Sequence, residues 1–94
     1  MRQVELRPAA RRDLARLERH LQRKSPRAAL RMFMTLSTQI LSLGDQPFKG
    51  RQGRAPDLRE LVVQFGKSGY VVRYRVTDDS VIIIRIWHGL EDRP

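Results

Sequence analysis

Two stretches rich in β-branched and aromatic residues constrain the fold of this chain most. They are Tyr70–Val76 and Val81–Trp87, and the four residues Thr77–Ser80 separate them. β-branched and aromatic side chains favour extended strands, whereas Asp and Ser favour turns. The pattern therefore predicts a β-hairpin near the end of the chain.

Side chains alternate between the two faces of a strand, so each strand of this hairpin divides into two sets. One face is predicted to be purely apolar and to join the core; its residues are Val72, Tyr74, Ile82, Ile84 and Ile86. The opposite face carries the guanidinium groups of Arg73, Arg75 and Arg85. Like charges on paired strands repel unless an anion lies between them. We therefore expect Arg73 and Arg85 to bind a ligand, and to be replaceable by Gln with little loss of stability.

Two amphipathic helices are predicted before the hairpin. The first begins at Pro8, a residue that suits the first turn of a helix. It carries an apolar stripe beside a line of arginines, Arg12, Arg16, Arg19 and Arg23. Ser25 and Pro26 mark the break, with Ser25 as the N-cap of the second helix. The second helix has a continuous apolar stripe formed by Ala29, Phe33, Leu36, Ile40 and Leu43.

A short strand at Gln3–Arg7, a basic loop at Phe48–Pro56 and a strand at Leu58–Gln64 complete the pattern. The predicted fold class is α+β, in the order β-α-α-β-β-β, with the helix hairpin packed on one face of a small, mainly antiparallel sheet. A chain of 94 residues suits one domain, so we assign residues 1–94 to a single unit.

The charge balance indicates the kind of partner. The chain holds 19 Lys and Arg against 10 Asp and Glu, a net charge of +9. Such a balance favours a polyanion or an acidic protein as partner. Most of the basic residues are Arg, whose planar fork suits phosphates and carboxylates.

Several classes of site are excluded or unsupported by composition. The absence of Cys excludes disulfides, thiolate nucleophiles and Cys-based zinc sites. Two histidines, His20 and His88, are too few to indicate a structural metal, and no cofactor is predicted. No signal-peptide core and no membrane-spanning run is present, so we expect a cytoplasmic protein without membrane contacts.

The whole chain resembles the RelE/ParE toxin superfamily of bacterial type II toxin–antitoxin systems, and it is nearer the ParE branch. The resemblance rests on the order and spacing of Arg51–Leu61, Tyr70–Val76 and Val81–Gly89, with Leu6–Leu14 similar to the family's first strand and helix. It implies a toxin that arrests growth by inhibiting DNA gyrase and that forms a hetero-oligomer with an acidic cognate antitoxin. The alternative within the superfamily is a RelE-like, ribosome-dependent mRNA endonuclease.

The resemblance and the arginine face together give candidate site residues. The predicted contacts to the target or to nucleic acid are Arg51, Arg54, Arg59, Arg73, Arg75 and Arg85. In a nuclease, His88 would act as general acid or base beside Arg73 and Arg85. The resemblance does not let His88 distinguish the branches, because the family's nucleases use a His among other residues here and ParE-branch members also show a His-Gly pair. No Tyr follows His88 as it does in some nucleases. Glu60 should point away from Arg59, and so away from the arginine face.

The second helix offers a candidate antitoxin surface. Met32, Met34 and Leu41 widen its apolar surface beyond the main stripe, and Trp87 ends the last strand. We predict these four residues as antitoxin contacts, because an amphipathic segment binds such a surface through apolar anchors. The alternative is that they belong to the core of the domain.

Overall fold

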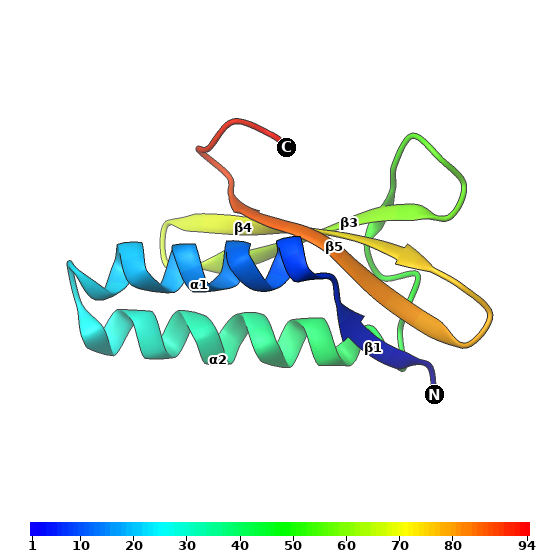
Figure 1. The fold of residues 1–94 in the computed structure, drawn as a ribbon, viewed down its shortest axis with the longest axis horizontal. Helices are drawn as coiled ribbons and strands as arrows, with labels where there is room; N and C mark the ends of the chain where they lie inside the picture. The colour runs from blue at the N-terminus through cyan, green and yellow to red at the C-terminus, as the bar shows by residue number, and fades with distance from the viewer.

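The computed structural model describes residues 1–94 and confirms the predicted α+β class (Figure 1). The two helices lie side by side against one face of a five-stranded sheet, as the helix hairpin was expected to do. One element is additional, because a two-residue strand lies within the predicted basic loop. The elements are β1 (Gln3–Leu6), α1 (Pro8–Gln22), α2 (Pro26–Ser42), β2 (Arg51–Gln52), β3 (Leu58–Phe65), β4 (Ser68–Val76) and β5 (Ser80–His88).

The sheet places the first strand of the chain beside the last one. Its strand order is β1-β5-β4-β3-β2, with β1 parallel to β5 and all other neighbours antiparallel. β1 pairs only with Ser80–Ile83, so the second half of β5 has no strand neighbour on that side. Helix α1 contacts β5. At this open edge the Ile86 amide donates a hydrogen bond to a side chain of α1 instead of to a strand.

Local sequence signals explain where the helices begin. Pro8 is the first residue of α1, and Pro26 is the first residue of α2. At the break between them, Ser25 Oγ accepts a hydrogen bond from the Ala28 amide at 3.2 Å. This contact satisfies one of the amides that every helix leaves free in its first turn. The predicted helix break and N-cap are confirmed.

Helix α2 turns a slightly different face to the core than predicted. Its buried residues are Ala29, Met32, Leu36 and Ile40, with Leu43 just beyond its end, whereas Phe33 is partly exposed. Met32 is fully buried, so its assignment as an antitoxin contact was wrong. The physical reason is that α2 packs against both α1 and β3, and this rotates the buried stripe from Phe33 toward Met32.

A β-bulge in β5 changes which residues face the core. Arg73 pairs with Arg85, but the next pair is Tyr74 with Ile83, so Ile84 is an extra residue in β5. A bulge shifts the alternation of side chains by one position. Val81, Ile83 and Ile86 are therefore fully buried, and Ile82 and Ile84 are not. The prediction that Ile82 and Ile84 share the core face with Ile86 was wrong for this reason.

Candidate functional site

The outer face of the sheet, which is turned away from the helices, carries the predicted arginines of the hairpin. Arg73 and Arg85 lie opposite one another across β4 and β5, as expected, and Arg75 lies opposite Ile82 on the same face. Each of these three arginines already has a carboxylate partner within the chain. The anion that the like-charged strands require is therefore supplied by the protein itself.

Three guanidinium groups lie close to the Glu60 carboxylate on this face. Arg73 Nε and Nη2 both donate to Glu60 Oε2, at 3.2 and 3.1 Å. Arg51 and Arg93 approach the other carboxylate oxygen, at 3.7 and 3.9 Å. Glu60 is buried, and it lies opposite Arg73 in the β3–β4 register. The prediction that Glu60 points away from the arginine face was wrong.

Arg59 lies on the other side of the sheet from Glu60. Its partner across β4 is Tyr74, a core residue, and its guanidinium donates to the carbonyl oxygen of Gly50 at 2.7 Å. A second hydrogen bond, to the Phe48 carbonyl, is 3.3 Å long. Arg59 therefore holds the segment before β2 in place and does not join the arginine face. Its placement follows from the one-residue alternation that puts Glu60 on the outer face.

Asp13 of α1 occupies the open edge of β5. Arg85 donates to both carboxylate oxygens, at 2.7 and 3.1 Å, and the Ile86 amide donates to Asp13 Oδ2 at 2.8 Å. Asp13 is only 4% exposed. Burial by itself would raise the pKa of Asp13, but the hydrogen bonds from Arg85 and Ile86 and the charge of Arg85 outweigh it and lower the pKa. The carboxylate thus joins helix to sheet where no strand is present.

Trp87 is covered on the outer face. Its ring lies 4.9 Å from the Arg73 guanidinium and 6.0 Å from that of Arg93, and only 3% of the residue is exposed. The C-terminal residues return over this region, since Arg73 donates to the Pro94 carbonyl at 3.0 Å. A residue covered in this way is not available as a contact surface, so the assignment of Trp87 to antitoxin binding was wrong.

His88 is directed to the opposite side of the sheet from Arg73. It lies opposite the buried Tyr70, and the two rings meet edge to face at 5.2 Å. His88 Nδ1 accepts a hydrogen bond from the Leu90 amide at 3.1 Å, so the neutral ring carries its proton on Nε2. The three residues proposed as a nuclease centre, His88, Arg73 and Arg85, do not converge on one point.

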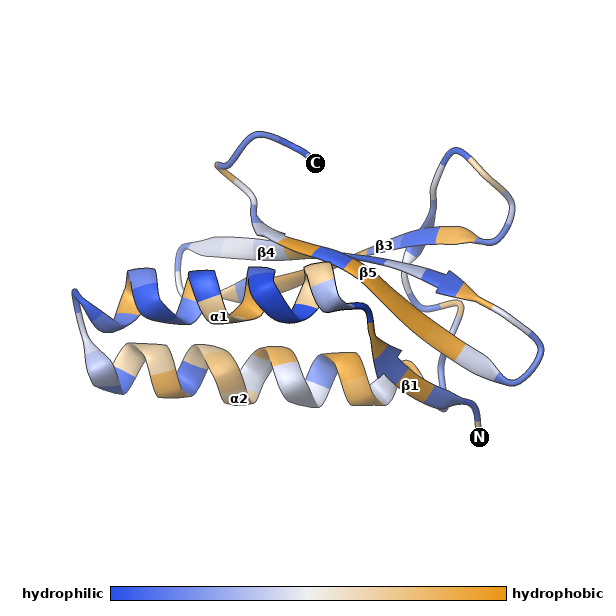
Figure 2. Cartoon of the chain, viewed as in Figure 1, coloured by the Kyte–Doolittle hydropathy of each residue, from blue (hydrophilic) through white to orange (hydrophobic).

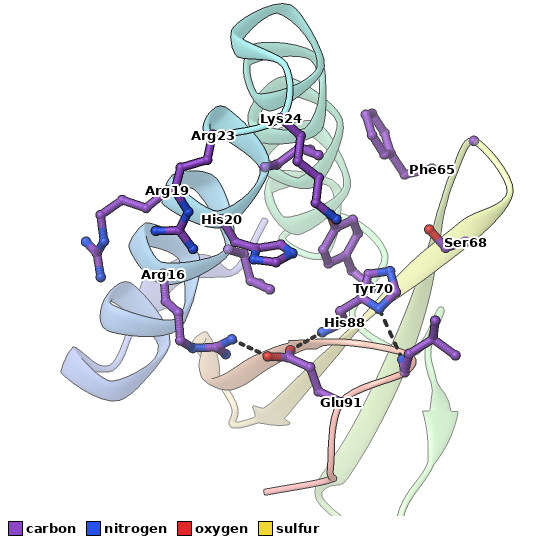
Figure 3. A pocket seen from close by; sticks show the side chains of 14 residues that line it. Arg16, Arg19, His20, Arg23, Lys24, Phe65, Ser68, Tyr70, His88 and Glu91 are labelled. Carbon is purple, nitrogen blue, oxygen red and sulfur yellow. Dashed lines mark hydrogen bonds and ion pairs between the residues drawn. The ribbon is translucent and has the colours of Figure 1, made fainter.

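A cleft on the helix side was not identified from the sequence. It has a volume of about 810 Å³ and lies between the second half of α1, the β3–β4 turn and the end of β5; we call it the α1 cleft (Figure 3). Basic residues of α1 and the turn after it form one wall: Arg16, Arg19, His20, Arg23 and Lys24. The line of arginines at helical spacing was the signal for this wall, but nothing in the sequence showed what lies opposite.

The opposite wall of the α1 cleft is aromatic. Phe65, Tyr70 and His88 line it, and Figure 3 shows His20 and Lys24 pointing across toward Tyr70 and His88. Burial raises the pKa of the Tyr70 hydroxyl, and the nearby Glu91 carboxylate adds to this effect. The phenol therefore stays neutral and can donate a hydrogen bond.

Glu91 closes one end of the α1 cleft and fixes the residues after β5. Its Oε1 forms an ion pair with Arg16, and its Oε2 accepts a hydrogen bond from the His88 amide at 2.6 Å. Both carboxylate oxygens are thus engaged within the chain.

Apolar residues gather on the outer side of α2. Met34 is 60% exposed and Leu41 is 62% exposed, as their assignment to a partner surface requires. Leu30 and Phe33 extend the same side at helical spacing. We call Leu30, Phe33, Met34 and Leu41 the α2 stripe, and Figure 2 shows α2 as largely apolar beside the more hydrophilic α1. Neither α1 nor α2 has the length and hydrophobicity of a membrane-spanning helix, and no group of three His, Cys, Asp or Glu side chains lies close enough to hold a metal ion.

The model of the family described as the ParE toxin of the type II toxin–antitoxin system parDE matches residues 4–93. The chain belongs to the ParE toxin family. Its assignment to the RelE/ParE superfamily is thereby confirmed.

Relatives of this ParE-family toxin are named as toxins too. It is 44% identical to toxin RelE3 of Caulobacter vibrioides over 99% of this chain and 100% of the relative. It is 45% identical to toxin RelE1 of the same species, over 89% of each chain. Among solved structures, the chromosomal ParDE system from P. aeruginosa contains a chain that superimposes with a TM-score of 0.75 at 21% identity, covering 94% of this chain and 96% of that one. This structural likeness supports the fold.

Proposed function

We propose that this ParE-family toxin arrests growth by binding and inhibiting DNA gyrase, and that it does not act by cleaving RNA. The observation that supports this most is the separation of the candidate nuclease residues. Glu60 holds Arg73 and Asp13 holds Arg85, while His88 lies on the other side of the sheet. RNA cleavage requires an acid or base and a cation on the same phosphate, because the charge develops at one centre.

Within the predicted target-binding set, Arg51 and Arg54 are the best placed to contact gyrase. Both are exposed and belong to the segment between α2 and β3. Arg54 forms no ion pair, and Arg51 lies 3.7 Å from Glu60 with most of its side chain exposed. The other members are engaged in contacts within the fold.

The second candidate is a ribosome-dependent mRNA endonuclease. Two observations favour it: the Caulobacter relatives are named RelE toxins, and His88 lines a cleft rich in cations. In that mechanism His88 would transfer a proton, and cations of α1 would stabilise the phosphate.

The two functions damage different molecules in the cell: gyrase inhibition leaves broken DNA, whereas the nuclease cuts mRNA. After induction of the toxin, we expect primer extension on translated messages to show no new cuts, and an SOS reporter to respond to broken DNA. The His88→Ala variant should still arrest growth. Cuts within codons of ribosome-bound message that disappear in His88→Ala would reject gyrase inhibition in favour of the nuclease.

We further propose that an acidic antitoxin neutralises this toxin by placing an amphipathic segment on the α2 stripe. The exposed apolar side chains of the stripe support this, as does the net charge of +9. An antitoxin that is partly disordered when free can cover a large surface as it folds on binding. Charge attraction should make the association sensitive to salt.

The double substitution Met34→Gln and Leu41→Gln tests this surface. We expect affinity for the product of an acidic open reading frame next to the toxin gene to fall about a hundredfold, because two apolar anchors are lost. The melting temperature should change little, since both side chains are exposed. Isothermal titration calorimetry at low and high salt measures the affinity, and thermal denaturation followed by circular dichroism measures the melting temperature. Unchanged affinity in the double variant would remove the stripe from the interface, and affinity independent of salt would contradict the electrostatic contribution.

A further inference from the structure

We infer that the α1 cleft binds a phosphorylated small molecule of nucleotide size. This site is separate from the α2 stripe and from the exposed arginines before β3. It is also the cleft in which the nuclease alternative would place its phosphate, so the test below compares ATP with an oligonucleotide. Two observations support the inference. Several basic residues of the cleft have no carboxylate partner, and the polar groups there that lack a partner are mainly hydrogen-bond donors.

Most of the positive charge of the α1 cleft has no carboxylate partner in the chain. On the sheet side, Arg51, Arg73, Arg75, Arg85 and Arg93 all lie within 4.0 Å of a carboxylate. In the cleft, Arg16 is paired with Asp13 and Glu91, but Arg19, Arg23 and Lys24 form no ion pair. Cations that line a concave surface without counter-charges focus a positive potential there. Three unpaired cations, Arg19, Arg23 and Lys24, thus line this cavity.

The free polar groups of the α1 cleft are mainly hydrogen-bond donors. The neutral Tyr70 hydroxyl and the His88 Nε2–H have no partner in the chain, and guanidinium and ammonium groups can only donate. The one carboxylate, Glu91, has both oxygens occupied by Arg16 and the His88 amide. A site rich in donors and without a free carboxylate suits an oxyanion, and phosphate oxygens accept several charge-assisted hydrogen bonds at once.

The size and the floor of the cleft indicate what the phosphate is attached to. A volume of about 810 Å³ is far more than one phosphate needs, and lies in the range of sites for small organic ligands. The floor is apolar: Phe65 and Tyr70 lie with ring centres 6.2 Å apart and planes tilted by 58°, beside Leu17 and Leu21. Tyr70 and Leu17 are nearly buried, so the partly exposed Phe65 and Leu21 provide most of the apolar contact for a ring whose phosphates reach the basic wall of α1. A nucleotide combines these two parts.

Titration of the full-length free toxin with ATP in about 0.15 M salt, where exposed charges are screened beyond about 8 Å, tests the inference. Arg23→Gln with Lys24→Gln should weaken ATP binding at least about tenfold, the loss expected for removing charge-assisted hydrogen bonds. The matched control is Arg11→Gln with Arg31→Gln, which removes the same charge from exposed positions outside the cleft. This control should weaken binding by less than about twofold. Tyr70→Phe, which keeps the ring and removes the hydroxyl, should also weaken ATP binding.

Further probes separate the parts of the ligand and its source. Pyrophosphate should bind more weakly than ATP, and adenosine should bind far more weakly, because each lacks one half of the recognised group. The inference is overturned if ATP shows no binding at millimolar concentration, or if both double variants weaken it equally. It is also overturned if a single-stranded oligonucleotide or a hexaglutamate peptide binds the α1 cleft more tightly than ATP, since the cleft would then serve a nucleic acid or an acidic protein.

Discussion

Replacing Arg85 with Gln should lower the free energy of unfolding by about 3 kcal/mol at pH 7. The substitution leaves the Asp13 carboxylate buried without its main cation, and removes hydrogen bonds of 2.7 and 3.1 Å. Urea denaturation followed by circular dichroism measures the loss. The result would correct the expectation from sequence that Arg85 is free to bind a ligand and can be replaced with little loss of stability.

The Arg75→Gln variant is the matched control for this experiment. Arg75 pairs with Asp57 at 2.7 Å, but the two side chains are 45% and 46% exposed, so the pair should contribute less than about 1 kcal/mol. Equal losses in the two variants would contradict the structural role of the Asp13–Arg85 pair.

The stability that the Asp13–Arg85 pair provides should depend on pH in one direction. Because the folded-state pKa of Asp13 is lowered, its contribution is complete above the unfolded-state pKa of about 3.9 and is lost as pH falls through the folded-state value. The difference between wild type and Arg85→Gln should therefore be full at pH 7 and shrink below about pH 4. A difference that grows on acidification would show that another group is responsible.

The Ile83→Ala variant should lose about 2–5 kcal/mol of stability, the range for truncating a fully buried aliphatic side chain. Ile84→Ala should lose clearly less, because Ile84 is the extra residue of the β5 bulge and is only partly buried. Urea denaturation of both variants gives the comparison. If Ile84→Ala were the more harmful change, β5 would alternate regularly and the bulge would be incorrect.

Local features of the fold could be predicted because their causes lie within a few residues. The break at Ser25 and Pro26 depends on a cap and a fixed backbone angle, and the hairpin depends on strand-forming residues around a turn. The β5 bulge could not be predicted in this way. It is a property of the pairing between β4 and β5. Four consecutive β-branched residues, Val81–Ile84, give no sign in the sequence of where the alternation shifts.

The carboxylate partners of the arginines could not be predicted from the sequence for a related reason. Asp13 and Arg85 are 72 positions apart, and only the packing of α1 along the open edge of β5 brings them together. Alternation correctly placed Arg59 and Glu60 on opposite faces, but it could not show which of them shares a face with Arg73. The basic wall of the α1 cleft was visible as helical spacing, while its aromatic wall comes from three other elements of the fold.

The most direct test of the proposed function is a supercoiling assay with purified gyrase and purified toxin. We expect the toxin to inhibit supercoiling of relaxed plasmid and to trap broken DNA, and expect prior incubation with the antitoxin to prevent both effects. Arg51→Gln with Arg54→Gln should weaken the inhibition, while a ribosome-bound message treated with the same toxin should stay intact. Normal supercoiling at toxin concentrations that cut the message would contradict the account.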